Sequence, residues 1–562
     1  MARYDPITLG ILWDKLTSIV DEAFSTLTHI SFSTVLRETF DCSCTILDAE
    51  GRSLAEATNA VPSFLGTMKY TIQHFLDRFP PSGLMPRDVI ATTDPWIGTG
   101  HLYDINMAMP IFHGDELVAY VGVIAHLPDM GGSRLGGSSR EVYEEGLRIP
   151  VCKLVENGEP NELVMDFVRS NVRMPEQVIA DIRSEIATAV FCERWLKETI
   201  EEFRIGDFLG LADAIIERSE EIMRGAISKI QGGEYEYTNY VDGFDAPVKI
   251  CCRMEIERDR IDVDYSGTDL QVDRGINCPL NYTRAFTHLG VKSVTVPELP
   301  NNTGFVSPIS VHAPEGSILN PQPPCATGAR ARIGHHLPQF IWGALADALP
   351  GKVVAEHGMH NSVNLAGRHR DGTPFGILLM SEGGFGARPR DDGPHTTAAP
   401  TNLSPAPVEV VEGDTSLLFR HRKLIPDSGG AGRFRGGCGQ EISIANTTGH
   451  RLHTGVMVTR GTIPARGYHG GLSGSRREVL INGETAHPFE RYLLEPGDSF
   501  VIRDAGGGGF GPPSERAVER VVEDMRNGFV TVEAAEELYG VSIDPQSWKV
   551  TRWGNSNWFT IQ

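Results

Sequence analysis

The chain has 562 residues, more than one hydrophobic core can serve, so we expect several domains. A hydrophobic content of 40% and a charged content of 22% are ordinary for a globular protein and exclude wholesale disorder. The formal net charge of −22 would repel phosphate backbones and anionic lipids, which excludes nucleic acid and membrane surfaces as expected partners. The sequence shows no membrane-spanning apolar run and no signal peptide, so we expect a cytoplasmic protein.

Amphipathic helices dominate the first third of the chain. Asp5 and Pro6 are typical of a helix start, and the apolar residues from Ile7 to Leu27 then recur at helical spacing. Pro175 begins a second long amphipathic stretch. The predicted elements are helix over 6–27, two strands around a turn over 44–57, helix over 64–78, alternating strands and turns over 88–126, and helix over 160–204 and 207–231.

Short strands are predicted beyond Gly232, and glycine-rich strands beyond residue 370. A helix over 330–349 separates the two regions, and a final helix is expected to begin at a Ser514 cap. We therefore predict an α+β multidomain protein, with helical N-terminal and middle segments, mixed β-sheet units and a glycine-rich, strand-rich C-terminal half. The predicted domains are 1–231 (an α/β metal-site domain), 232–329 (β-rich), 330–513 (mixed, glycine-rich β) and 514–562 (a helical tail).

Glycines cluster in GGGGFG at 506–511, but they do not form a nucleotide-binding motif. A P-loop needs a lysine and a hydroxyl after its glycines, and the sequence has no such string. No glycine run has the strand, helix and acidic residue of a dinucleotide fold either. We expect these glycines to allow positive φ angles and close backbone approach, and any ATP to be bound by another chain.

The nine cysteines include no C-x-x-C pair, so we expect reduced and mostly buried thiols. A metal site at Cys42 and Cys44 is the weaker alternative, because no second pair has ligand spacing.

Two copies of the pattern H-x-x-D carry the strongest chemical signal. HLYD at 101–104 follows a turn-rich stretch, and HLPD at 126–129 follows a predicted strand. Imidazole and carboxylate together suit a borderline divalent cation, and the ends of ordered elements are usual places for a site. These copies predict a metal-assisted enzyme.

The predicted metal ligands are Asp41, His101, Asp104 and His126. A carboxylate at position 41, between Phe40 and Cys42, needs a neutralising partner, which is either the metal or a base such as Arg37. Two imidazoles and two carboxylates favour Mn, Fe or Zn over Ca or Mg. Asp129 is expected to orient a histidine or to replace Asp104 as a ligand.

Other polar residues have two interpretations each. Glu145 and Arg148 lie in a loop that is either a solvated acidic turn or a substrate-facing segment, in which Arg148 holds an anion and a glutamate moves protons. Asp94 is expected only to cap the turn at Pro95. His335 and His336 could form a second metal site, but no carboxylate lies within four residues of them, so they are assigned to the polar face of a helix.

In combination, several strings resemble the hydantoinase B family over about residues 5–545. They are DPITLGIL, RETFDCSCTILDAEGR, TTDPWIGTGHLYD, AHLPDMGG, EVYEEGLRIP, GGFGARPRDDG, GGAGRFRGG and DAGGGGFG. This family includes N-methylhydantoinase B, the related half of 5-oxoprolinase, caprolactamase β subunits and subunits of acetone and acetophenone carboxylases. The resemblance maps the family's metal ligands onto Asp41, His101, Asp104 and His126. One departure is that many relatives have G-G-T-H where this chain has Gly98-Thr99-Gly100-His101.

The resemblance also implies a hydantoinase A-type partner that binds ATP and phosphorylates the carbonyl oxygen of the substrate. The first hypothesis is then ATP-dependent hydrolysis of a cyclic amide, such as hydantoin, 5-oxoproline or a lactam, with Asp129 or Glu145 accepting a proton. The second is ATP-dependent carboxylation of a ketone, and the third is a non-catalytic subunit that shapes the complex. Which ring is opened is not encoded in any motif.

Overall fold

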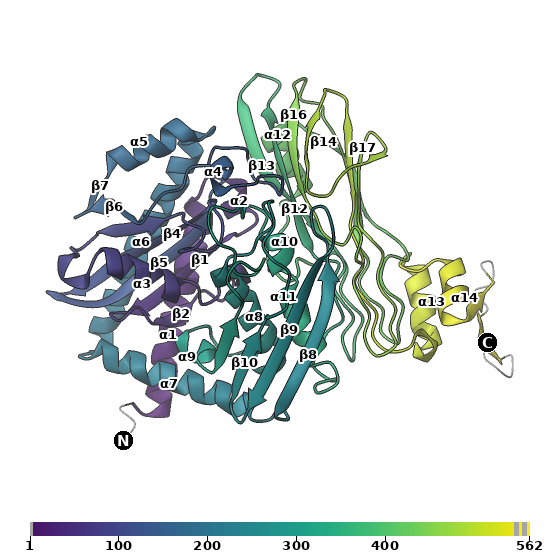
Figure 1. The fold of residues 1–562 in the computed structure, drawn as a ribbon, viewed down its shortest axis with the longest axis horizontal. Helices are drawn as coiled ribbons and strands as arrows, with labels where there is room; N and C mark the ends of the chain where they lie inside the picture. Colours follow the sequence, from purple (N-terminus) through teal and green to yellow (C-terminus); the bar gives the residue numbers. More distant parts are fainter. Residues whose placement is uncertain (1–3, 545–549, 553–558, 562) are drawn as a thin grey trace.

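The computed structural model describes residues 4–544, 550–552 and 559–561 (Figure 1). It is a mixed α+β molecule built from several sheets, which confirms the predicted fold class. Within the described residues, no helix combines the length and the apolar composition needed to cross a membrane.

The N-terminal part contains an antiparallel sheet with the strand order β2-β1-β5-β4-β3-β6-β7. Every residue of β1, and all but the first three of β5, are buried, because helices cover the sheet. The strands are β1 (Cys42–Asp48), β2 (Ser53–Glu56), β3 (Val89–Thr92), β4 (Asp104–His113), β5 (Glu116–His126), β6 (Cys152–Glu156) and β7 (Glu159–Pro160).

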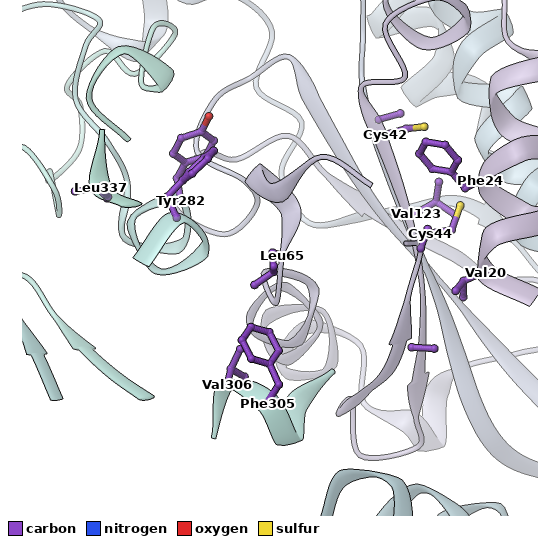
Figure 2. Packing of buried hydrophobic residues seen from close by; sticks show 14 of the residues in the cluster. Val20, Phe24, Cys42, Cys44, Leu65, Val123, Tyr282, Phe305, Val306 and Leu337 are labelled. Carbon is purple, nitrogen blue, oxygen red and sulfur yellow. The ribbon is translucent and has the colours of Figure 1, made fainter. Parts of the chain in front are cut away.

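The helix α1 packs along this sheet and along α6. Asp5 caps α1 by accepting hydrogen bonds from the amides of Ile7 and Thr8, as the sequence predicts. Figure 2 shows Val20 and Phe24 of α1 against Cys42, Cys44 and Val123 of the sheet. The helices here are α1 (Pro6–Ile30), α2 (Thr34–Arg37), α3 (Met68–Arg78), α4 (Val142–Glu145), α5 (Glu162–Asn171), α6 (Pro175–Glu202) and α7 (Phe208–Ile227), with 3-10 turns η1 (Pro62–Phe64) and η2 (Pro81–Gly83).

The middle region contains a half-exposed sheet and a buried helix that the sequence pattern did not predict. The sheet has the order β11-β10-β9-β8, and the unforeseen helix α8 packs against α11. Because α8 is buried on most sides, it lacks the polar face that marks an amphipathic helix. The elements are β8 (Gly233–Val241), β9 (Val248–Glu257), β10 (Arg260–Asp264), β11 (Ile309–His312), α8 (Leu280–Thr295), α9 (Thr303–Val306), α10 (Ala331–Gly334) and α11 (Leu337–Ala344).

Two further sheets share a buried cluster in the C-terminal half. Their strand orders are β13-β12-β16-β19 and β14-β15-β20-β17-β18. The elements are β12 (His360–Arg368), β13 (Pro374–Glu382), α12 (Val408–Thr415), β14 (Leu418–Leu424), β15 (Gln440–Ala445), β16 (Leu452–Met457), β17 (Glu478–Ile481), β18 (Glu484–Thr485), β19 (Arg491–Leu494) and β20 (Ser499–Arg503).

Glycine-rich segments run side by side between these sheets and the C-terminal helices at the end of the long axis (Figure 1). A Cβ atom on Gly506 would lie 1.8 Å from the carbonyl oxygen of Ser428, and one on Gly507 would lie 2.1 Å from that of Phe385. Neither glycine has a positive φ. The close-approach part of the prediction therefore holds, whereas positive φ is not the reason for glycine at these two positions.

The C-terminal tail differs from its predicted form in two respects. Its first α-helix begins at Val518 with Ala517 as N-cap, whereas Ser514 lies in the preceding 3-10 turn η3 (Pro513–Glu515), so the predicted Ser514 cap is wrong. The tail also contains strands in addition to helices. Its elements are α13 (Val518–Arg526), α14 (Val532–Tyr539), β21 (Val541–Ile543), β22 (Val550–Arg552) and β23 (Phe559–Ile561).

Candidate metal centre

Strand register brings three of the four predicted ligands to one end of the N-terminal sheet. Asp104 is the first residue of β4 and pairs directly with His126, the last residue of β5. Strand β1 lies on the other side of β5, and the backbone carbonyl of Asp41, just before β1, accepts a hydrogen bond from the amide of His126 at 3.0 Å. Side chains distant in sequence therefore meet at one edge of the sheet, where β1 and β4 begin and β5 ends.

His101, Asp104 and His126 offer ligand atoms that all lie within 4.8 Å of one another. The Nε2 atom of His101 lies 2.7 Å from Oδ1 of Asp104. The other carboxylate oxygen of Asp104 accepts hydrogen bonds from the Thr99 hydroxyl at 2.6 Å and from the Arg330 guanidinium at 2.5 Å. Hydrogen bonds therefore fix the orientation of this carboxylate, as expected for a ligand held by its surroundings.

The His126 ring is in the chemical state that a metal ligand needs. Burial, followed by the influence of His101, lowers the pKa of His126 to about 3, so the imidazole is neutral. Within the described residues, its buried Nδ1 atom has no hydrogen-bond partner. A buried imidazole nitrogen without a partner beside a carboxylate fits a divalent cation, and the donor set suits Mn, Fe or Zn.

Asp41 lines the same small cavity, of about 60 Å³, as His101, Asp104 and His126, but it stands outside the tight group of three. Burial, and then the charge of Asp104, raise the pKa of Asp41 to about 8, while Arg330 opposes this shift. The alternative partner Arg37 is 3.6 Å from Glu38 instead. A second buried carboxyl next to Asp104 favours a cation between them.

Aromatic and imidazole side chains from other elements complete the wall of the cavity. They include Tyr282 of α8, His335 next to α10, and His360 at the start of β12. The hydroxyl of Tyr282 lies 2.9 Å from Nε2 of His335. Nδ1 of His360 lies 2.9 Å from a carboxylate oxygen of Glu382, which pairs with it across the β12–β13 hairpin. These contacts fix both imidazoles in place.

The sequence model of the Hydantoinase B/oxoprolinase family matches residues 5–513. The chain belongs to this family. It is 28% identical over 579 residues to the B component of a putative D-/L-hydantoinase of Pseudomonas sp. (strain NS671), covering 97% of this chain and 96% of that protein. It is 27% identical over 577 residues to the β subunit of caprolactamase of Pseudomonas jessenii, covering 97% of each.

Two solved structures share the fold of this hydantoinase B-family chain. The crystal structure of the ATP-dependent caprolactamase from Pseudomonas jessenii matches with a TM-score of 0.89 and 25% identity, covering 97% of this chain and 98% of that chain. The nucleotide-free acetone carboxylase matches with a TM-score of 0.87 and 20% identity, covering 99% of this chain and 81% of the other. At 20% identity, the similarity to acetone carboxylase shows a shared fold and nothing further.

The three residues expected to act in catalysis lie outside the cavity that the histidines line. Asp129 is bound by Arg173, whose guanidinium lies 2.7 Å from it, and the two line a larger neighbouring cavity. Arg148 is 39% exposed and lies 3.8 Å from Asp94. Asp94 accepts a hydrogen bond from the Trp96 amide at 3.0 Å, which confirms its predicted role in the turn.

Glu145 is buried behind the metal centre. Its carboxylate accepts hydrogen bonds from the amides of Thr327 and Gly328, and the carbonyl of Gly328 is 3.4 Å from Nδ1 of His101. Burial, opposed by these amides, raises the pKa of Glu145 to about 7. Glu145 thus holds the turn that contacts His101 and leads to Arg330.

Sequence reasoning missed the contribution of residues beyond position 280. Arg330 had no motif to mark it, although it forms the hydrogen bond to Asp104. His335 and His336 are buried, 4% and 2% exposed, so their assignment to a polar helix face is wrong. The two histidines themselves were the available signal, because an H-H pair in an apolar helix suggests a buried role. All nine cysteines, each in a described position, are without a disulfide partner, and most of them are buried, as the sequence predicts.

Proposed function

We propose that the chain is the metal-dependent component of an ATP-dependent cyclic amide hydrolase that acts with a hydantoinase A-type, ATP-binding subunit. The single observation that carries this proposal is the buried group of His101, Asp104 and His126 in a chain of this family. The hydantoinase and caprolactamase relatives, each named as one subunit of its enzyme, support both the reaction class and the second subunit.

In this proposal His101, Asp104 and His126 hold a divalent cation, and Asp41 is the fourth ligand. Two neutral imidazoles and two carboxylates suit Mn, Zn or Fe. Such an ion supplies Lewis-acid chemistry, because it polarises carbonyl oxygens and lowers the pKa of water. Thr99 and Arg330 hold Asp104, so they position a ligand and do not bind the ion themselves.

His360 is the residue that we propose to move a proton. Glu382 engages its Nδ1, and the residue lines the same cavity as the three proposed ligands. An imidazole oriented by a carboxylate can take a proton from water and give it to a leaving nitrogen. The sequence also suggested Glu145 and Asp129 for this role. We propose instead that Glu145 positions the Thr327–Gly328 turn and that Asp129 positions Arg173.

ATP is assigned to the partner because the sequence has no P-loop and its glycine runs serve backbone packing. Amides resist water, and phosphorylation of the carbonyl oxygen by the partner would make the ring carbon electrophilic. Ketone carboxylation, the second hypothesis, has no observation in its favour beyond the acetone carboxylase fold.

The test is to co-purify the chain with its partner subunit and to assay ring opening of hydantoin, 5-oxoproline and caprolactam with ATP. His126→Ala and Asp104→Asn should lose both bound metal, measured by elemental analysis, and turnover. The control His74→Ala removes an exposed imidazole and should keep both. Turnover that persists without metal or ATP contradicts the proposal, bicarbonate consumption indicates the carboxylase, and unchanged activity in both variants indicates a non-catalytic subunit.

The proposed role of His360 is tested separately. His360→Asn should retain the metal and lose turnover by about 100-fold or more, because it removes the proton acceptor but not a ligand. Glu382→Gln should give a smaller loss and shift the pH profile, since it alters only the orientation and basicity of the ring. Wild-type turnover in His360→Asn with metal bound would refute the role.

A further inference from the structure

A second, larger cavity lies beside the metal centre, with a volume of about 820 Å³. Along β12 the metal cavity is lined by Ser362, and the larger one by Asn364 and Ala366. These residues lie two apart, so they share one face of the strand. On the paired strand β13, Met380 and Leu378 line the first cavity and Gly376 lines the second.

The two cavities therefore follow one another along a single face of the β12–β13 hairpin. Tyr103 stands between them, since it lines the larger cavity while its ring centroid lies 5.5 Å from that of His126 and 5.8 Å from that of His101. The adjacent residues Arg134 and Leu135 likewise face the larger and the smaller cavity. A molecule in the larger cavity is thus next to the metal centre.

The larger cavity carries an uncompensated positive charge. Its two carboxylates are already paired, Asp129 with Arg173 at 2.7 Å and Glu495 with Arg451 at 2.8 Å. Arg368, which also lines it, donates to the carbonyl of Gly372. Arg134 remains: within the described residues its side chain has no ion-pair or hydrogen-bond partner, and its Nε is buried. A partly buried guanidinium whose Nε lacks a partner is suited to a ligand that supplies the anion.

The backbone that presents Arg134 is held firmly. The guanidinium of Arg491, at the start of β19, donates to the Ser133 hydroxyl, the Arg134 carbonyl and the Ser139 hydroxyl at 3.0–3.2 Å. Arg134 itself has a φ of +67°, a strained value for a residue with a side chain. A backbone conformation of this kind persists only where the surrounding contacts impose it. Here the imposed conformation directs the Arg134 guanidinium toward the cavity.

We propose that the larger cavity is an oxyanion-binding chamber, in which Arg134 holds a phosphate or carboxylate group of the molecule that reacts at the metal centre. This inference deepens the proposed function, because substrate activated by a partner would arrive as a phosphate ester, whereas a substrate such as 5-oxoproline carries a carboxylate. Both anions match the fork of a guanidinium. The chamber therefore selects anionic substrates or intermediates.

The test is calorimetric titration of the purified chain, loaded with metal, with inorganic phosphate and separately with acetate. Arg134→Gln should weaken binding of the preferred anion by about 10- to 100-fold, because it removes a charged donor. Arg134→Lys should restore part of the affinity. The control Arg420→Gln, an exposed arginine on β14, should bind as the wild type does. Unfolding midpoints and metal content should match across all variants.

Preference for phosphate identifies the activated intermediate as the ligand, and preference for acetate identifies a substrate carboxylate. If the wild type binds neither anion, or if Arg134→Gln binds as tightly as the wild type while folded and metal-loaded, the inference is overturned. This readout needs no turnover, so it stays separate from the cyclic amide assay. In the active complex, Arg134→Gln should raise KM more than it lowers kcat.

Discussion

Arg330 is a side chain from a distant segment that completes the candidate metal centre. It donates to Asp104 and, through Nε, to the carbonyl of Thr99 at 2.7 Å, so it fixes both a ligand and the turn before His101. Its charge also opposes the rise in the pKa of Asp41. Because 226 residues separate Arg330 from Asp104, no local pattern could have indicated this contact.

Glu56, a buried carboxyl away from the metal centre, should make stability depend on pH. Burial, opposed by the Gly66 amide and Ser53, raises its pKa from 4.5 to about 7. The folded state therefore holds the proton more tightly, and the resulting stabilisation, complete below pH 4.5, is lost as the pH rises through about 7. The loss amounts to about 3 kcal/mol for a shift of this size.

Glu56→Gln removes this titration, so its unfolding midpoint relative to the wild type should rise between pH 5 and pH 8. Thermal unfolding at closely spaced pH values measures the effect. Glu315→Gln, an exposed carboxyl, is the control and should show no trend. A Glu56→Gln difference that is the same at both ends of the range would show that Glu56 does not titrate there.

The glycine-rich segments tolerate substitution poorly, because their backbones pack against one another. Gly507→Ala would place a Cβ 2.1 Å from the carbonyl oxygen of Phe385, in a contact made of backbone that cannot move aside. We expect a loss of about 3 kcal/mol or more in the free energy of unfolding. Urea unfolding followed by fluorescence measures it.

Gly10→Ala in α1 is the matched control, because a Cβ at Gly10 meets no atom within 4 Å. Alanine is the better helix former, so this change should stabilise the protein by about 1 kcal/mol. Equal effects of the two substitutions would mean that backbone packing does not determine the glycines at 506–509.

Distant parts of the molecule contribute to the candidate metal centre, because the N-terminal sheet, the middle region and the β12–β13 hairpin each supply part of its wall. A buried ion pair links segments within the C-terminal half. Arg477 pairs with Asp504 at 2.9 Å and also donates to the carbonyls of Gly358 and Met359, just before β12. Both side chains are fully buried.

Arg477→Met should therefore cost about 3–5 kcal/mol, because it leaves the Asp504 carboxylate buried without a counter-charge. Arg253→Met breaks an exposed pair with Glu234 and should cost less than about 1 kcal/mol. Thermal unfolding of both variants decides the point, and similar midpoints would show that the buried pair does not hold these segments together.

Local sequence patterns were enough to predict the family, the α+β class, the start of α1 at Asp5 and Pro6, and the residue types that suit a divalent cation. These features are local: caps, periodicity and short motifs depend on neighbouring residues. The two H-x-x-D copies share one sequence pattern, but their aspartates lie in different cavities of the folded chain. Strand register pairs Asp104 with His126, whereas Arg173 binds Asp129 in the next cavity.

Long-range packing decides which distant residues line the candidate metal centre. Arg330, His335 and His360 reach it through helix packing and hairpin placement, for which no spacing rule exists. Packing also left Arg134 without an ion pair among the described residues, because the two carboxylates that line its cavity pair with Arg173 and Arg451. Short motifs indicate which ligand groups the chain contains, whereas long-range packing determines which of these groups lie close together.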